Sequence, residues 1–143
     1  WVPSEEELAQ FANIDLPVML TASGADLPFT YDSVNDRILD ALQGLVNQML
    51  SINEMPAIQT FDFEANPFSG FRADRLVTRT LNNEYINRTW YLEKDGVPLV
   101  ALNLTEGLTH ALYPEYGKVF WDFVKHYSRD AATGEIVYDP YVS

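Results

Sequence analysis

Cysteine is absent from this chain of 143 residues, which excludes disulfides, thiolate metal sites and a cysteine nucleophile. Positive charge is scarce, since nine lysines and arginines stand against 21 aspartates and glutamates and the formal net charge is -12. Such acidity repels phosphate backbones and anionic lipids, so we expect no nucleic-acid partner and no membrane partner. No apolar run approaches the roughly 20 residues that span a bilayer. None of these features indicates a cellular compartment.

Apolar residues make up 47% of the chain, enough for one globular core of ordinary size. A capping box at Ser4 and Glu7 predicts a short helix over about 5–11. Residues 16–22 are almost wholly apolar, which is typical of a strand buried on both faces of a parallel sheet. Gly24 is expected to relax the backbone in the turn that follows this strand.

A long helix is predicted after this turn, with Asp32 or Ser33 as its N-cap. Its apolar residues recur at steps of three and four: Val34, Ile38, Leu42, Leu45, Val46 and Met49. Residues 57–79 show no period and mix phenylalanines with polar and turn-forming residues, which indicates an excursion over the surface. We weigh two roles for this excursion, a lid over an active site and a loop attached to the core by its aromatic rings, and favour the second.

Two strands are predicted next, over 84–93 and 97–104, joined into a hairpin by the turn at 94–96. A last helix is predicted over about 117–127. Its inward-facing residues are Val119, Phe120, Phe123 and Val124. Beyond it, residues 130–143 show no clear period and contain a turn at 133–134. The order of strands and helices indicates the α/β class.

Asp26 and His110 each follow a predicted buried strand. Loops at strand ends are free to converge while the sheet holds them, and a carboxylate that orients an imidazole activates a hydroxyl nucleophile. By itself Asp26 would also fit an Asx-type turn, and a lone loop histidine is usually a surface residue. Asp32 is a competing acid that we assign to the helix cap, and His126 lies near a helix C-terminus, where its charge suits the helix dipole.

Three stretches of the chain carry a family resemblance. They are 16–29 with Gly24-Ala25-Asp26, 97–114 with Gly107-Leu108-Thr109-His110, and 120–127 with the sequence Phe-Trp-Asp-Phe-Val-Lys-His-Tyr. In this order they resemble the C-terminal portion of an α/β-hydrolase, in the branch of polyhydroxybutyrate depolymerase-like and feruloyl or acetylxylan esterase-like proteins. The resemblance assigns 1–130 to the hydrolase domain and 131–143 to a C-terminal tail. It implies that Asp26 is the triad acid and His110 the general base of a serine hydrolase acting on carboxylic esters.

The serine of this family is missing from the sequence. No Gly-x-Ser-x-Gly elbow is present, because Ser23 lacks the first glycine and Ser69 follows Pro67 and Phe68 rather than a buried strand. The oxyanion hole, built partly from the amide after that serine, is expected to be absent as well. We therefore expect a hydrolase fragment, inactive alone, whose missing N-terminal half supplies the nucleophile. The resemblance implies a small-molecule or glycan-linked ester as substrate.

The alternative is a non-catalytic binding module that keeps the shape of the fold. It would contact a glycan or a protein through the excursion at 61–71 or through the hairpin aromatics Tyr85, Trp90 and Tyr91. No metal-ligand motif such as His-x-x-x-His occurs, so we expect neither a metal nor another cofactor. A parallel sheet cut from its neighbours exposes an apolar strand edge, so the isolated chain is expected to self-associate.

Overall fold

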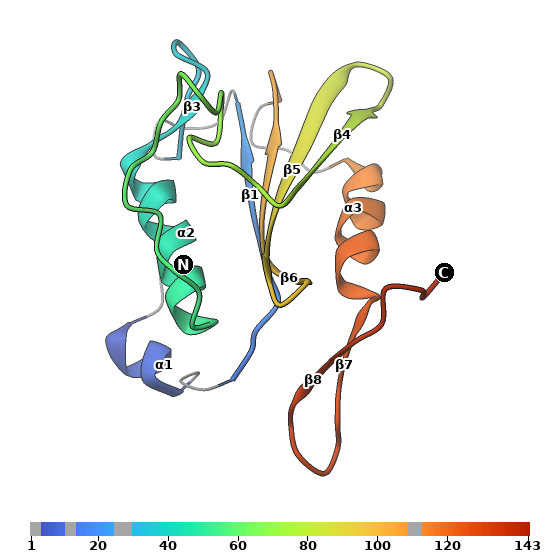
Figure 1. Cartoon of the computed structure of the whole chain (residues 1–143). Coiled ribbons are helices and arrows are strands. Elements are labelled where there is room, and N and C mark those ends of the chain that lie inside the picture. Colours follow the sequence, from blue (N-terminus) through green and yellow to red (C-terminus); the bar gives the residue numbers. More distant parts are fainter. Residues whose placement is uncertain (1–3, 11–13, 25–29, 109–112) are drawn as a thin grey trace.

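A computed structural model gives the structure of the protein and describes residues 4–10, 14–24, 30–108 and 113–143. Figure 1 shows a sheet with helices on both of its sides. In chain order the elements are α1 (Glu5–Gln10), β1 (Val18–Ser23), β2 (Tyr31–Asp32), β3 (Arg37–Ile38), α2 (Asp40–Ile52), β4 (Arg75–Leu81), β5 (Tyr85–Lys94), β6 (Val97–Thr105), α3 (Pro114–Val124), β7 (Tyr127–Arg129) and β8 (Ile136–Tyr138). This mixture of a sheet and covering helices places the chain broadly in the α/β class, as predicted.

The main sheet has four strands in the order β1-β6-β5-β4. Only β1 and β6 run parallel; β5 is antiparallel to both β6 and β4. The expected parallel pairing is found between β1 and β6, the predicted hairpin forms the antiparallel pair of β5 and β6, and the pair of β4 and β5 was not predicted. Both antiparallel pairs follow from their connections, because short turns join β4 to β5 and β5 to β6, and a short turn reverses the chain.

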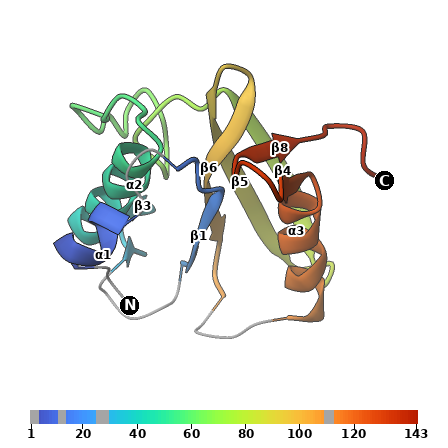
Figure 2. The same ribbon diagram turned by 90° about the horizontal axis from the view of Figure 1, so that it is seen from below.

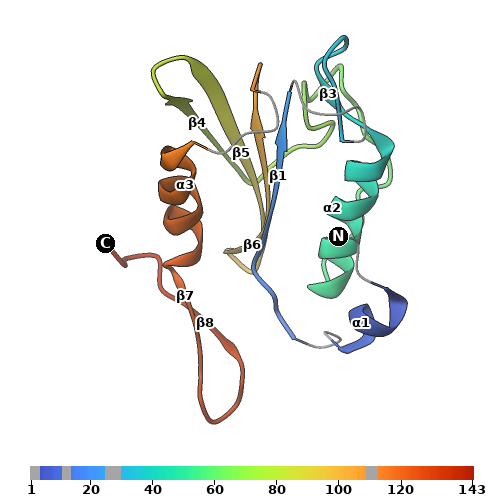
Figure 3. The same ribbon diagram turned by 180° about the vertical axis from the view of Figure 1, so that it is seen from behind.

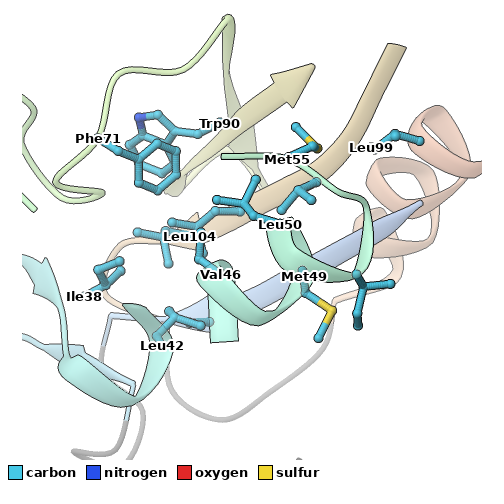
Figure 4. Close-up of a cluster of buried hydrophobic side chains, with 14 of the residues drawn as sticks. Ile38, Leu42, Val46, Met49, Leu50, Met55, Phe71, Trp90, Leu99 and Leu104 are labelled. Carbon is cyan, nitrogen blue, oxygen red and sulfur yellow. The ribbon is translucent and has the colours of Figure 1, made fainter. Parts of the chain in front are cut away.

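The sheet lies between α2 and α3, as the view from below shows (Figure 2). Clusters of buried side chains fill the space on both of its faces. On the α2 side, Val46 and Leu50 pack with Leu102 and Trp90, all at most 5% exposed. Figure 4 shows this cluster, with Phe71 of the excursion lying against Trp90. Burying each such large side chain contributes about 2 kcal/mol, so this layer is the principal core.

The first helix forms where the capping box predicts it. The Ser4 amide donates to the Glu7 carboxylate at 2.8 Å, and the Glu7 amide donates to the Ser4 hydroxyl at 3.2 Å. These reciprocal bonds satisfy two amides that a helix start leaves without partners. The prediction for this element is confirmed.

The predicted helix after the first strand starts too early. Residues 31–38 form the hairpin β2–β3, and α2 begins only at Asp40. Asp32 does accept the amides of Val34 and Asn35, at 3.0 and 3.2 Å, but it stabilises the turn of this hairpin instead of a helix. Val34, which the helical pattern counts as its first inward-facing residue, is instead 88% exposed.

Strand β4 was not predicted, because residues 75–79 were assigned to the irregular excursion. In the structure 75–81 pair with 85–91. Asn82 and Asn83, both with positive φ, make the turn between them, and the Glu84 amide donates to the Leu81 carbonyl at 3.0 Å. Asparagine tolerates this left-handed backbone, so the Asn-Asn pair is the signal that was overlooked. The next turn has Asp95 and Gly96 at positive φ and joins β5 to β6, which confirms the hairpin predicted over 84–104.

The C-terminal segment follows the prediction in part. Helix α3 runs from Pro114 to Val124, three residues earlier than predicted at both ends, and Val124 is 48% exposed instead of buried. After α3 the chain folds back as the hairpin β7–β8. This hairpin lies at the end of the molecule opposite the carboxyl ends of β1 and β6 (Figure 3). Among the described helices, none has both the length and the hydropathy needed to cross a membrane.

Candidate functional site

Strands β1 and β6 end side by side. Their last residues, Ser23 and Thr105, are partners in the parallel register, and the Gly24 amide donates to the Thr105 carbonyl at 2.7 Å. The sequence places Asp26 two residues after Gly24 and His110 five residues after Thr105. Asp26 and His110 themselves lie outside the described residues. What the structure brings together is the pair of strand ends from which their loops begin.

A side chain at Gly24 would be crowded by its neighbours. A Cβ atom added there would lie 3.2 Å from the Gly107 amide nitrogen and 3.3 Å from both the Thr105 carbonyl oxygen and the ring of Tyr31. Gly24 is not among the glycines with positive φ, so the predicted role of relaxing the turn is wrong. Its role is close approach. The two segments leave the sheet in direct contact.

A group of charged and aromatic side chains lies beside these strand ends. Arg88 forms an ion pair with Glu106 at 2.9 Å, and its guanidinium lies over the Phe68 ring at 4.2 Å from the centroid. Tyr31 is 4% exposed, and burial raises the pKa of its phenol, an effect that nearby Asp36 and Glu106 increase. Tyr31 therefore stays neutral at physiological pH.

A row of polar side chains crosses the sheet at the same level. Ser23, Thr105, Asn87 and Arg79 are aligned by the registers of the four strands. Asn87 donates to Thr105 Oγ1 at 2.9 Å and also to Asn103 Oδ1, and Arg79 donates to Thr89 Oγ1 at 2.9 Å. The residues of this group with no exposed surface are Asn87, Thr89, Asn103 and Thr105. The sequence analysis did not predict this buried network.

Tyr116 of α3 completes the network from the facing layer. Its hydroxyl and the Thr105 hydroxyl form a hydrogen bond. Burial raises the pKa of this phenol, and the hydroxyls of Thr105 and Ser23 reduce that rise. Residues aligned in register share a face of the sheet, so the whole row faces α3. Tyr116 thus joins Thr105, the last residue of β6, to the first turn of α3.

The other polar residues that the sequence singled out have structural partners. Hydrogen bonds from Asn35 and from backbone amides lower the pKa of Asp32, which serves the β2–β3 turn. Ser69 is fully buried and donates to the Phe71 carbonyl at 3.1 Å. His126 binds the Asp139 carbonyl through Nδ1 at 2.8 Å, in the β7–β8 region. Within the described parts of the chain, no group of three potential metal ligands comes together.

A cavity of about 400 Å³ lies between the excursion and the β4–β5 hairpin. Its lining includes Phe68, Phe71, Arg72, Leu76, Arg88 and Trp90. Arg88 connects this cavity to the strand ends through Glu106. A second cavity, of about 440 Å³, is lined by Asp15 and Lys94 at the opposite end of β1 and is remote from this region.

Comparison with known proteins adds no assignment: no protein-family model, no curated protein and no solved structure matches the chain.

Proposed function

We propose that this chain is the C-terminal part of a carboxylic-ester hydrolase with the α/β-hydrolase fold, in which Asp26 is the triad acid and His110 the general base. The nucleophilic serine and the oxyanion hole come from residues outside this sequence. The proposal rests on one observation, the parallel pairing of β1 and β6 with their carboxyl ends in contact at Gly24 and Gly107.

This contact supports the proposed pairing of the two residues, because each of their segments begins near it. An extended chain spans at most about 3.5 Å per residue, so Asp26 lies no more than about 7 Å from Gly24 and His110 no more than about 10 Å from Gly107. A hydrogen bond between their side chains is therefore geometrically allowed. Had β1 and β6 been antiparallel, the two loops would begin at opposite ends of the sheet.

The free edge of β1 leaves room for the missing serine. Among the described strands β1 pairs only with β6, and its other edge has no partner there. In a sheet of parallel strands, further strands carrying the nucleophile would add at this edge. Their serine would then arrive at the same carboxyl end as Asp26 and His110, where ligands bind in open α/β sheets.

The chemistry follows from these roles. One ring nitrogen of His110 takes the serine proton as the oxygen attacks the ester carbonyl, and Asp26 accepts a hydrogen bond from the other. The tetrahedral intermediate expels the alcohol, which receives the proton from His110, and leaves an acyl-enzyme. Water, deprotonated by His110, then releases the carboxylic acid.

Nuclear magnetic resonance of the 15N-labelled chain tests the pairing directly. We expect a downfield ring N–H proton of His110 that disappears in Asp26→Ala, since the hydrogen bond to a carboxylate protects it from exchange. His126→Gln assigns the two histidines. Asp32→Ala is the matched control, because it removes the neighbouring acid, and it should leave the His110 signal unchanged. A ring N–H signal of His110 that is the same in Asp26→Ala as in the unaltered chain would overturn the hydrolase proposal.

The binding module is a second candidate, which the cavity beside Phe68 and Trp90 favours. Its volume of about 400 Å³ suits one sugar or aryl ring. Phe68 of the excursion and Trp90 of the hairpin, which belong to the two predicted contact segments, both line it. Titration with a panel of oligosaccharides, followed by tryptophan fluorescence, tests this candidate. Saturable binding that Phe68→Ala abolishes and Phe63→Ala does not would support it; no response to any sugar would exclude a glycan.

A further inference from the structure

Phe68 has a backbone conformation that its residue type disfavours. Its φ is 70, in the left-handed region where a bulky side chain is crowded. Among the described residues, the other non-glycine residues with positive φ are all polar: Asp36, Glu54, Asn82, Asn83 and Asp95. Such strain persists only where the surrounding structure imposes it, and it points to a function of the strained residue.

The contacts around Phe68 hold it in this conformation. Its carbonyl accepts the Ile38 amide at 3.0 Å, which joins the excursion to β3. The next residue, Ser69, is fully buried and donates to the Phe71 carbonyl at 3.1 Å. The Phe68 ring lies against the guanidinium of Arg88, at 4.2 Å from the ring centroid. The strained residue therefore presents its ring and an arginine together at the cavity between the excursion and the β4–β5 hairpin.

This cavity combines an apolar interior with positive charge. Phe71 and Trp90, each 5% exposed, are its most buried lining residues, and Figure 4 shows them against each other. Among the described residues that line it, Arg72 and Arg88 are ionisable and none is a carboxylate. The chain as a whole has a net charge of -12, so the cavity differs in sign from the rest of the molecule.

The two arginines contribute differently to this charge. Arg88 pairs through Nη1 with one oxygen of Glu106 at 2.9 Å, and this pair offsets its charge. Arg72 is exposed and adds a second positive charge at the same cavity. The cavity therefore keeps a net positive charge beside aromatic surface. A guanidinium binds a carboxylate through charge-assisted hydrogen bonds that match its planar shape.

We propose that this cavity binds a small aromatic carboxylate, with its ring against Trp90 and Leu76 and its carboxylate at Arg72. The volume of about 400 Å³ holds one ring with a short acidic side chain. A neutral sugar lacks the charge that the arginines recognise, and an aliphatic acid lacks the flat face that packs against an indole. The site does not involve Asp26 or His110, so it is independent of the proposed hydrolase activity.

Titration of the 15N-labelled 143-residue chain with phenylacetate tests this site, with phenylacetamide as the neutral ligand of similar shape. We expect a saturable shift of the Trp90 indole N–H and an affinity for phenylacetate about tenfold higher than for phenylacetamide, the difference made by one charge-assisted hydrogen bond. Added salt should weaken the binding of phenylacetate alone. The indole N–H of Trp121, which is 58% exposed on α3, should not shift.

Arg72→Gln is the test variant, and Arg75→Gln is its matched control. Both arginines are exposed, but the Arg75 guanidinium lies over the Tyr91 ring at 4.4 Å, on the α3 face of the sheet. Arg72→Gln should weaken the binding of phenylacetate about tenfold and leave that of phenylacetamide unchanged, whereas Arg75→Gln should change neither. Leu76→Ala, at an exposed lining position, should weaken both ligands because both bury the same ring.

Three results would overturn the proposal. They are equal affinities for phenylacetate and phenylacetamide, equal effects of Arg72→Gln and Arg75→Gln, and the absence of saturable binding by phenylacetate. Saturable binding of a neutral oligosaccharide at Trp90, without a response to phenylacetate, would replace the aromatic carboxylate by a glycan. None of these results bears on the hydrogen bond between Asp26 and His110, so failure here leaves the hydrolase proposal to its own test.

Discussion

Asn87 and Asn103 are adjacent buried amides, and we predict that truncating them has unequal effects. Asn87 uses both ends of its amide: Nδ2 donates to Asn103 and Thr105, and Oδ1 accepts from Arg79 at 3.4 Å. Asn103 accepts one hydrogen bond, and its buried Nδ2 has no partner among the described residues. Asn87→Ala therefore leaves a buried acceptor without its donor, whereas Asn103→Ala removes a donor that was already unsatisfied.

The magnitudes follow from the cost of buried unsatisfied groups, about 1–3 kcal/mol each, and from a net value of about 1 kcal/mol per neutral hydrogen bond. Both variants create a similar cavity, so that cost cancels in the comparison. We expect Asn87→Ala to lower the free energy of unfolding by about 2 kcal/mol more than Asn103→Ala does. The double variant should cost less than the sum of the two, because the residues share a hydrogen bond.

Urea unfolding followed by circular dichroism measures both values. The midpoint should shift with an unchanged slope, since the surface exposed on unfolding stays nearly the same. The two neighbours are equally buried, with no exposed surface, so burial alone predicts equal losses. Equal losses, or a larger loss for Asn103→Ala, would refute the reasoning from hydrogen-bond satisfaction.

Four further predictions follow from the structure. Gly70→Ala should destabilise the chain by about 2 kcal/mol, because Gly70 has φ 75 and an added Cβ would lie 2.9 Å from the Phe63 ring. Gly44→Ala, in an open position of α2, should instead stabilise the chain by about 1 kcal/mol. Urea midpoints test both variants, and shifts of the two midpoints in the same direction would contradict the argument. Burial raises the pKa of Tyr31, Tyr116 and Tyr127 above 10.0, so their contribution to stability is complete below pH 10 and is lost as the pH rises through the folded-state values. Tyr127→Phe should make the fall of the urea midpoint above pH 10 less steep, and an unaltered slope would count against this cause. The isolated chain should not hydrolyse p-nitrophenyl acetate, and turnover that His110→Ala abolishes would show that no other polypeptide is needed. The chain should self-associate through β1; Thr21→Lys should weaken this association in sedimentation experiments, whereas Thr78→Lys on β4 should not, and equal effects would rule out the β1 edge.

The contrast between the two edge strands explains why association is expected at β1. Strand β4 carries Arg75 and Arg79, and charged side chains protect an edge from pairing with another chain. Strand β1, with the sequence Val-Met-Leu-Thr-Ala-Ser, carries no charge. An edge without such protection is the one suited to accept a further strand, whether from a second copy or from the rest of a larger protein.

Elements with local signals could be predicted from the sequence. The capping box of α1 and the Asp95-Gly96 turn of the β5–β6 hairpin depend on residues only a few positions apart, and both predictions are confirmed. The hairpin β2–β3 could not be separated from a helix start, because Asp32 gives the same signal for both: a side-chain oxygen that accepts amides two and three residues later.

Register and strand order could not be predicted from such local signals. The pairing of β1 with β6 joins residues more than 80 positions apart, for example Ser23 with Thr105, and no short pattern encodes it. The alignment of Ser23, Thr105, Asn87 and Arg79 depends on three registers at once. For this reason the sequence did not predict the polar network at the ends of β1 and β6.

The direction of polarity along β6 indicates what this network is for. Toward the start of β6 the α3 face is apolar, with Ala101 packed among Tyr91 and Phe123, whereas Asn103 and Thr105 at its carboxyl end are polar and fully buried. An apolar layer would avoid the desolvation cost of these groups, which their hydrogen bonds offset with a net gain of only about 1 kcal/mol each. Hydrogen bonds have direction and fix positions that apolar packing leaves adjustable. Their restriction to the end of the sheet from which the Asp26 and His110 segments depart is therefore best explained by a need to hold those strand ends in one arrangement.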